Sequence, residues 1–176
     1  MDLFKKHEGI LNKATEALHA RTFFARFPEM PAPAVYGETA DADGQKKFKA
    51  LIGSQYNELL QDDPQSWIGD EESPYLQESL NIKYPAFPAE ILVERSRKAF
   101  HAWRKVSHEE RAGILLETLE RVKNRFFEIA YATMHTTGQG FMMAFQASGP
   151  HAADRALEAV AAGYEELRRF PSHARW

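Results

Sequence analysis

Hydrophobic positions divide the chain into two segments of different character. From residue 2 to about residue 19, apolar residues recur every seven positions, which predicts a helix with one buried stripe. The segment that follows has little periodicity and is rich in proline and glycine. Longer helical patterns begin near Pro88. We therefore expect an N-terminal helix with a proline- and glycine-rich extension over residues 1–86, and helices over residues 87–176.

Prolines and capping residues predict the structure of the first part of this extension. The segment Phe27–Gly37 holds three prolines. Proline fixes φ and disfavours helical geometry in the residue before it, so we expect an extended, irregular connector here. After it, Asp41 or Asp43 can cap a short helix that ends at Gly53.

A single strand pattern precedes the helical half of the chain. Apolar and polar residues alternate over residues 80–84, and Pro85 is expected to end the strand. Pro88 then stands where the first turn of a helix tolerates proline. One face of this helix is expected to carry Leu92, Ser96, Ala99 and Trp103.

Ser107 and Glu110 have the spacing of a capping box, which marks the start of a long amphipathic helix. Its apolar stripe consists of Ala112, Leu115, Leu119, Val122, Phe126, Ile129 and Thr133. Because this pattern is long for one globular helix, we expect a break near Asn124. Gly138 and Gly140 are expected to stop the helix.

The remaining pattern completes a mainly helical prediction. The stripe predicts that Leu115 and Leu119 are buried. A last helix runs to about Phe170, and Pro150 is expected to kink it or to mark a new start. The predicted fold class is therefore mainly α, with amphipathic helices, a proline-rich extended segment and one or two short strands.

Composition excludes several classes of function. Hydrophobic content of 44% and charged content of 27% over 176 residues are those of one globular domain. A net charge of −3 gives no general attraction to nucleic acid, and no apolar stretch has the length of a signal segment or a membrane span. The absence of cysteine excludes disulfides, thiolate metal sites and a cysteine nucleophile within these residues. We expect a cytoplasmic protein that binds neither nucleic acid nor membranes.

No group of residues has the spacing of a catalytic, cofactor-binding or metal site. His151 and Asp154 can share a helix face, but they supply only two of the ligands that a metal site needs. Thr136–Gly140 lacks the glycine spacing and the lysine of a phosphate-binding loop, so helix capping is the favoured interpretation. The apolar cluster Phe141–Phe145 is core, the wall of an apolar binding channel or a docking surface.

Three stretches of the second half carry a resemblance to a known family. They are Ala99-x-x-x-Trp103, Ser107-x-Glu109-Glu110-Arg111-Ala112-x-Ile114-Leu115 and Thr137-Gly138-Gln139. Together they resemble the N-terminal helical part of the aldehyde dehydrogenase superfamily. Common members of that superfamily have Glu-Thr-Gly-Lys where this chain has Thr136-Thr137-Gly138-Gln139.

A narrower resemblance extends over nearly the whole chain. It is carried by Pro28-Glu29-Met30-Pro31, Val35-Tyr36-Gly37-Glu38-Thr39, Ser73-Pro74-Tyr75, Met134-His135-Thr136-Thr137-Gly138-Gln139 and Phe141–Ala147 running into Gly149-Pro150-His151. These motifs resemble the phenylacetic acid degradation protein N family, aldehyde dehydrogenase-like enzymes linked to aerobic phenylacetate breakdown. The stretch from Met134 to His151 is the most specific part of the match.

The resemblance implies that the chemistry requires residues beyond this sequence. In the family, the cofactor-binding elements, the glutamate base and the cysteine nucleophile lie downstream. Residues 87–176 would then be the helical lead-in to a dinucleotide-binding domain that the chain does not contain. The parent protein would oxidise an aldehyde, a CoA-linked semialdehyde, to an acid with NAD or NADP. This N-terminal fragment alone would be inactive, with no cofactor site and no catalytic or metal-binding residue.

The resemblance also implies a role for the helix after the Thr-Gly stop. In the family this helix borders the substrate tunnel, which makes Phe141, Phe145 and His151 candidates for the tunnel wall. Two other interpretations stay open. The chain could be a non-catalytic interaction or dimerisation module whose exposed apolar helix face binds the remainder of the parent polypeptide or a second copy. It could also be a small enzyme that uses His135 or His151.

Overall fold

The computed structural model describes residues 2–171, and most of these residues are helical. The elements are α1 (Leu3–Ala20), α2 (Pro33–Tyr36), α3 (Ala40–Leu51), β1 (Ser66–Ile68), β2 (Glu72–Ser73), β3 (Glu78–Ser79), β4 (Tyr84–Ala86), α4 (Ala89–Trp103), α5 (His108–Lys123), α6 (Phe126–Thr137), α7 (Phe141–Gln146), a π-helical turn (Ala147–His151) and α8 (Ala152–Arg168). The predicted mainly α fold is confirmed. None of the described helices combines the length and the apolar character needed to cross a membrane.

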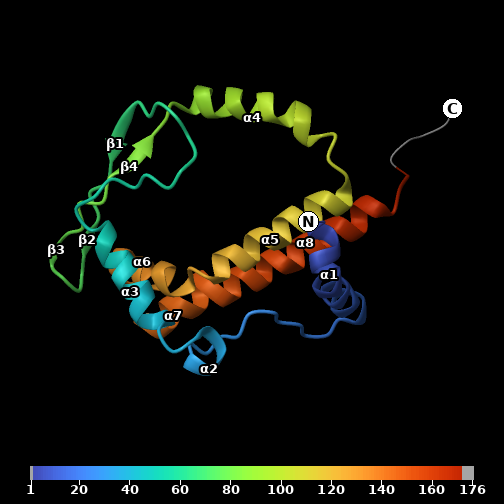
Figure 1. Ribbon diagram of the computed structural model, residues 1–176, viewed down its shortest axis with the longest axis horizontal. Coiled ribbons are helices and arrows are strands. Elements are labelled where there is room, and N and C mark those ends of the chain that lie inside the picture. The colour runs from blue at the N-terminus through green and yellow to red at the C-terminus, as the bar shows by residue number, and fades with distance from the viewer. Residues whose placement is uncertain (1, 172–176) are drawn as a thin grey trace.

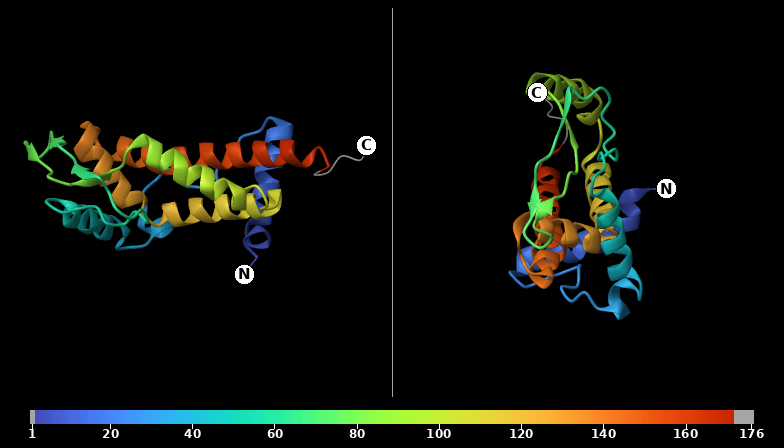
Figure 2. Two further views of the ribbon diagram at one scale, coloured as in Figure 1. Left: turned by 90° about the horizontal axis from the view of Figure 1, so that it is seen from above. Right: turned by 90° about the vertical axis from the view of Figure 1, so that its left-hand side faces the viewer.

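A long pair of helices forms the body of the molecule. Helices α5 and α8 lie side by side, and α1 packs across one end of the pair (Figures 1 and 2). Helices α3, α6 and α7 gather at the other end. The chain then departs from this body through the β-strands and returns to it through α4, so that α4 forms an arch above α5 and α8 (Figure 1).

The contact of α1 with the long pair encloses the first hydrophobic cluster. Its buried members are Leu11, Ala14, Ala112, Leu116, Leu157, Ala161 and Tyr164. Asp2 caps α1 by accepting a hydrogen bond from the backbone N–H of Lys5. The two helices approach so closely that a Cβ atom on Gly113 would lie 2.6 Å from the backbone nitrogen of Phe4. Glycine at this position therefore permits the packing of α1 on α5.

Aromatic side chains form a second cluster at the junction of α6, α7 and the connector. Phe27, Phe126, Phe127, Ala130, Phe145 and Ala153 are buried there, and the ring of Tyr36 packs on three of the phenylalanines. The predicted disturbance of the helix at Pro150 is confirmed, because Pro150 lies inside the π-helical turn that joins α7 to α8. Gly138 ends α6 in the left-handed conformation with φ of 76°, as predicted.

Two small antiparallel sheets of two strands each connect α3 to α4. Strand β1 pairs with β4 so that Trp67 lies opposite Pro85, and β2 pairs with β3. The predicted strand boundary is wrong, since the strand begins at Tyr84 and contains Pro85 instead of ending there. A proline is tolerated because each strand of a two-stranded sheet is an edge strand that has one side free of hydrogen bonds. Leu80 and Ile82 lie outside the strands but are buried with Phe48 in a third cluster.

Two other predictions of local structure also need correction. The connector is not extended throughout, because Pro33 starts the single turn of α2. Helix α3 begins at Ala40, so Asp41 and Asp43 occupy its first turn and neither caps it. Acidic side chains stabilise a first turn through the helix dipole, which explains their position without a cap.

The capping box and the break in the long helix are both confirmed. Ser107 and Glu110 exchange hydrogen bonds at the start of α5, and the helix is interrupted between Lys123 and Phe126. The predicted burial of Leu115 is wrong, because its side chain is 44% exposed and Leu116 is the buried residue. The face of α5 that carries Leu116 meets α1 and α8, whereas the face with Leu115 is uncovered.

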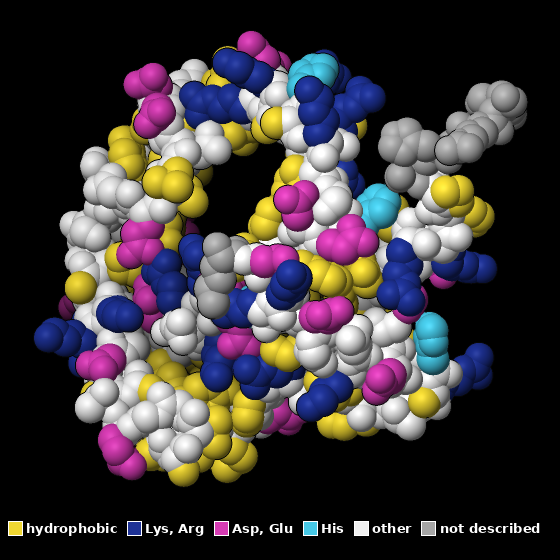
Figure 3. Space-filling model, turned by 45° about the vertical axis from the view of Figure 1, so that its right-hand side comes forward, with side chains coloured by type: hydrophobic (Ala, Val, Ile, Leu, Met, Phe, Trp, Pro, Cys, Tyr) yellow, Lys and Arg dark blue, Asp and Glu magenta, His cyan; other side chains and the backbone are white. Residues whose placement is uncertain are grey.

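Helix α4 differs from every other long helix of the described chain. No residue of α4 is buried, and its apolar side chains include Leu92, Val93 and Phe100. The four residues predicted to share one face, Leu92, Ser96, Ala99 and Trp103, are exposed, since no other described helix or strand packs along α4. The space-filling view shows an opening between the arch and the body, bordered partly by hydrophobic side chains (Figure 3).

Candidate functional site

The three predicted tunnel-wall residues lie close together in sequence but in different environments. Phe141 is half-buried against Tyr131 and Phe127, and Phe145 is fully buried in the aromatic cluster. His151 is half-exposed, and its Nε2 atom lies 2.9 Å from a carboxylate oxygen of Glu29. Within this chain Phe145 is thus a core residue. A tunnel wall built from these residues stays a prediction, because it needs a second wall opposite them.

His135 and Ser73 form a buried pair that joins α6 to the β2–β3 hairpin. The Oγ atom of Ser73 accepts hydrogen bonds from the backbone N–H groups of Tyr75 and Leu76. Its own hydrogen is therefore available for Nδ1 of His135, 2.7 Å away, an arrangement that requires a neutral imidazole with its proton on Nε2. Burial lowers the pKa of His135, and the positive charge of Lys49 lowers it further.

This pair has the atoms of a serine–histidine catalytic unit but lacks its accessibility. Ser73 is 1% exposed and His135 is 9% exposed, and the imidazole stacks on the ring of Phe48. A nucleophile must reach its substrate, and a base must be oriented by a third group. The pair therefore has a structural role, which is to hold the β2–β3 hairpin on α6. Both residues lie in motifs of the sequence, but they are 62 positions apart, so the sequence alone did not indicate that they are in contact.

The motif Ser73-Pro74-Tyr75 makes further contacts with the end of α6. The hydroxyl of Tyr75 donates to the carbonyl oxygens of Gly138 and Gln139, and the ring of Pro74 lies against Gly138. Two motifs that are far apart in the sequence therefore meet at one place.

A second meeting of motifs occurs where the connector crosses the start of α8. The hydroxyl of Tyr36 donates to the carbonyl oxygen of Pro28, and Glu29 pairs with His151. Asp154 is 7% exposed and accepts a hydrogen bond from the backbone N–H of Arg26 at 2.8 Å. Burial raises the pKa of Asp154, and burial together with the charge of Asp154 raises the pKa of Tyr36 to about 12. These groups fix the course of the connector.

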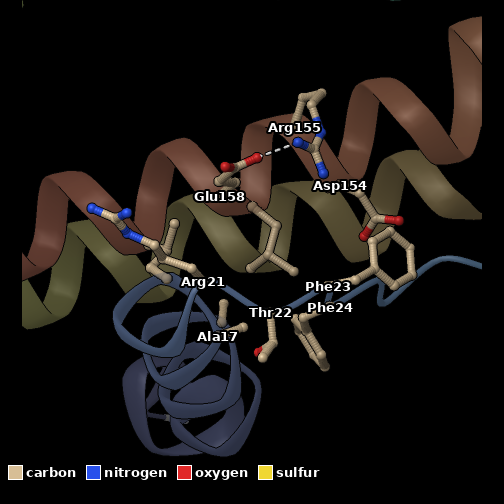
Figure 4. Close-up of a pocket in the computed structure, with 11 residues that line it drawn as sticks. Ala17, Arg21, Thr22, Phe23, Phe24, Asp154, Arg155 and Glu158 are labelled. Atoms are coloured by element: carbon tan, nitrogen blue, oxygen red, sulfur yellow. Dashed lines mark ion pairs between the residues drawn. The ribbon is translucent and has the colours of Figure 1, made fainter.

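An open pocket of about 310 Å³ lies beside Asp154, between the end of α1, the residues after it and α8 (Figure 4). Its wall includes Phe24 and Leu157, and Arg155 and Glu158 form an ion pair at its rim. The carboxylate of Asp154 already accepts a hydrogen bond from the backbone N–H of Arg26, and we identify no reactive group in this pocket. Among the described residues, no three histidine, aspartate or glutamate side chains are placed to hold a metal ion.

Two adjoining pockets lie where α4 meets the long pair of helices. The first is an apolar slot between α5 and α8, lined by Trp103, Leu115, Ala159, Val160, Gly163 and Leu167 among others. The second is a mainly basic corner lined by Arg104, Lys105, His108, Glu109, Arg111 and Arg168, of which Arg168 is paired with Glu165. His108 and Arg111 line both pockets, so the slot and the corner form one continuous surface.

Comparison with known proteins identifies a family. The model of the aldehyde dehydrogenase family matches residues 85–175. The crystal structure of an NAD-dependent aldehyde dehydrogenase from Burkholderia multivorans is similar to the whole of this chain, with 47% sequence identity and a TM-score of 0.92. The match spans the whole of this chain but only 31% of the Burkholderia multivorans protein. No curated protein matches the chain.

Proposed function

The chain belongs to the aldehyde dehydrogenase family, and we propose that it is the N-terminal part of a longer member that oxidises an aldehyde to an acid. The observation that carries the proposal is the full-length similarity to an NAD-dependent aldehyde dehydrogenase of which this chain covers 31%. The remaining part of such a protein would contribute the nucleophile, the base and the cofactor site.

The residues of this chain agree with that division of roles. The sequence holds no cysteine, so it cannot form the covalent thiohemiacetal through which the family oxidises aldehydes. It also has no glycine-rich turn with the spacing of a dinucleotide-binding motif. NAD or NADP would accept the hydride in the parent protein, but the residues present do not fit a site for it.

The narrower assignment to phenylacetate catabolism is part of the proposal. It is supported by the motifs that resemble the phenylacetic acid degradation protein N family. Ser73-Pro74-Tyr75 contacts His135, Gly138 and Gln139, and Pro28-Glu29 contacts Tyr36 and His151. We expect motifs that contact one another to occur together in a family, because together they maintain one local structure. On this assignment the substrate is a CoA-linked semialdehyde, and Phe141 and His151 border its tunnel, with the buried ring of Phe145 behind Phe141.

Enzyme assays test the proposal. The 176-residue chain and the polypeptide that its gene encodes to its natural stop are each mixed with NAD or NADP and with free and CoA-linked aldehydes. We expect no turnover by the 176-residue chain, and turnover by the longer polypeptide with a preference for the CoA-linked substrate. Turnover by the short chain would contradict the assigned division of roles. A preference for free aldehydes would contradict only the phenylacetate assignment.

A second candidate function is a non-catalytic interaction module that acts as a separate protein. The exposed apolar side chains of α4 favour it, since such patches mark interfaces. Its partner would be the remainder of a parent polypeptide or a second copy of the chain. Gel filtration distinguishes the second case, because self-association would give a dimer at micromolar concentration.

A further inference from the structure

One ion pair joins the N-terminal segment of the chain to a candidate residue of the tunnel wall. Nε2 of His151 lies 2.9 Å from a carboxylate oxygen of Glu29, and each of the two side chains is 49% exposed. The match to the family model begins at residue 85, so His151 lies inside the match and Glu29 lies before it. A residue outside the family match therefore contacts a candidate substrate-binding residue inside it.

Hydrogen bonds fix the segment that carries Glu29. The backbone N–H of Arg26 donates to the buried carboxylate of Asp154 in α8, and the hydroxyl of Tyr36 donates to the carbonyl oxygen of Pro28. The backbone is thus anchored immediately before Glu29, so its carboxylate reaches α8 from a defined position. An ion pair that is half-exposed contributes little to stability. The precise placement of this pair is better explained by a role in binding.

The π-helical turn fixes the other member of the pair. A Cβ atom on Gly149 would lie 3.1 Å from Cγ of Phe126, so glycine permits the close packing of the turn on α6. Pro150 is buried and has no N–H to donate to the preceding turn. His151 is the last residue of the turn. Single π-helical turns occur frequently at functional sites, and this one determines where the imidazole of His151 lies.

The ion pair also determines which atom of the imidazole is available to a ligand. A carboxylate only accepts hydrogen bonds, so Nε2 of His151 carries the hydrogen that Glu29 accepts. In the neutral imidazole, Nδ1 then has no hydrogen and can accept a hydrogen bond from another group. An amide N–H is a suitable donor. Simple free aldehydes have no such group, whereas the arm that links an acyl group to coenzyme A contains amides.

We propose that Glu29 is a positioning residue for the substrate, because it holds the imidazole of His151 so that Nδ1 accepts a hydrogen bond from an amide N–H of a CoA-linked aldehyde. The proposal rests on the proposed function, in which His151 borders the tunnel and the substrate is CoA-linked. The aldehyde group must reach the nucleophile, so the linking arm lies along the tunnel wall behind it. Glu29 touches no substrate and acts through His151.

Steady-state kinetics of the polypeptide that the gene encodes to its natural stop test this role. Glu29→Ala is expected to raise the KM for a CoA-linked semialdehyde about 10-fold, the effect of about one hydrogen bond. The value of kcat should change by less than about 2-fold, because the arm and not the reacting carbon is affected. Glu29→Gln retains an oxygen that accepts from Nε2 and should restore most of the affinity. An unchanged KM in Glu29→Ala, or no recovery in Glu29→Gln, would overturn the proposal.

A double substitution tests whether Glu29 acts through His151. His151→Ala is expected to raise the same KM about 10-fold, and the addition of Glu29→Ala should raise it no further. Effects that multiply would show that the two residues act independently and would overturn the proposal. Glu158→Gln is the matched control, because it removes a carboxylate that pairs with Arg155 on the same helix. This control should leave the KM unchanged.

The unsubstituted polypeptide separates this proposal from the proposed function. Oxidation of free aldehydes but not of CoA-linked ones would contradict the phenylacetate assignment and, with it, this proposal. If CoA-linked aldehydes are preferred and the KM of Glu29→Ala is unchanged, only this proposal fails. The Tm of the 176-residue chain should be the same with and without Glu29→Ala, because the pair is half-exposed. A clear fall in Tm would give the pair a structural role instead and would also overturn the proposal.

Discussion

Glu117 illustrates how one side chain on α5 fixes the position of α1. Its carboxylate lies 2.6 Å from Nζ of Lys6, 2.8 Å from Nε2 of His7 and 3.2 Å from Nε of Arg121. Hydrogen bonds from Lys6, His7 and Arg121 lower the pKa of Glu117 from its ordinary 4.5 to about 2. Two of these three donors belong to α1, so the contact couples the two helices.

Glu117→Gln is expected to lower Tm at neutral pH, because the variant loses the charge that these donors stabilise. The folded state resists protonation of Glu117 and the unfolded state does not, so this stabilisation is present above pH 4.5 and is lost as the pH falls towards 2. The difference in Tm between the native chain and the variant should therefore shrink over that interval. Glu8→Gln, on the exposed side of α1, serves as the control and should show no such trend.

Two glycines in helices are predicted to respond to alanine in opposite directions. A Cβ atom on Gly113 would lie within 3 Å of the backbone of Leu3 and Phe4, whereas one on Gly9 would meet nothing within 4 Å. Gly113→Ala should therefore destabilise the chain by about 1–3 kcal/mol through overpacking. Gly9→Ala should stabilise it by about 0.5–1 kcal/mol through helix propensity. Urea unfolding measures both, and a stable Gly113→Ala variant would refute the close contact of α1 with α5.

At the scale of elements, the Ser73–His135 contact holds the β2–β3 hairpin on α6. Ser73→Ala should cost about 1–3 kcal/mol, because it leaves buried hydrogen-bonding groups without a partner. The folded pKa of His135 lies below its ordinary 6.5, so the unfolded state binds a proton first as the pH falls. Stability from this contact is thus complete above pH 6.5 and declines below it.

Thermal unfolding of a His135→Asn variant checks this pH dependence. The Tm of the native chain should fall between about pH 7.5 and about pH 5.5, and the Tm of the variant should fall less over the same interval. His101→Asn, on the exposed surface of α4, is the matched control. Equal pH dependence in all three proteins would show that His135 does not titrate differently in the folded state.

Local signals in the sequence predicted the helices well, and tertiary contacts limited the rest. The capping box at Ser107, the glycine stop at Gly138 and the disturbance of the helix at Pro150 depend on neighbouring residues, so the sequence was sufficient for them. The burial of Leu115 was mispredicted because periodicity identifies an apolar face but not what covers it. The pairing of Ser73 with His135 depends on how hairpin and helix fold together, and no spacing rule indicates it.

At the scale of the whole molecule, a complete helical core coexists with an uncovered arch. The buried clusters join α1, α3 and α5–α8 with Phe27 of the connector and with Leu80 and Ile82 between β3 and β4, whereas α4 borders an opening (Figures 1 and 3). A family that places its nucleophile and cofactor site elsewhere explains both features. On the proposed function, these helices are a packing surface for the residues that perform the chemistry.

The DNA that follows the codon of Trp176 in the source genome tests this account most directly. We predict an open reading frame that continues into a segment with a cysteine nucleophile, a glutamate base and a dinucleotide-binding motif. A stop codon at that position, with no such segment downstream in any frame, would contradict the central claim that this chain is the N-terminal part of an aldehyde dehydrogenase.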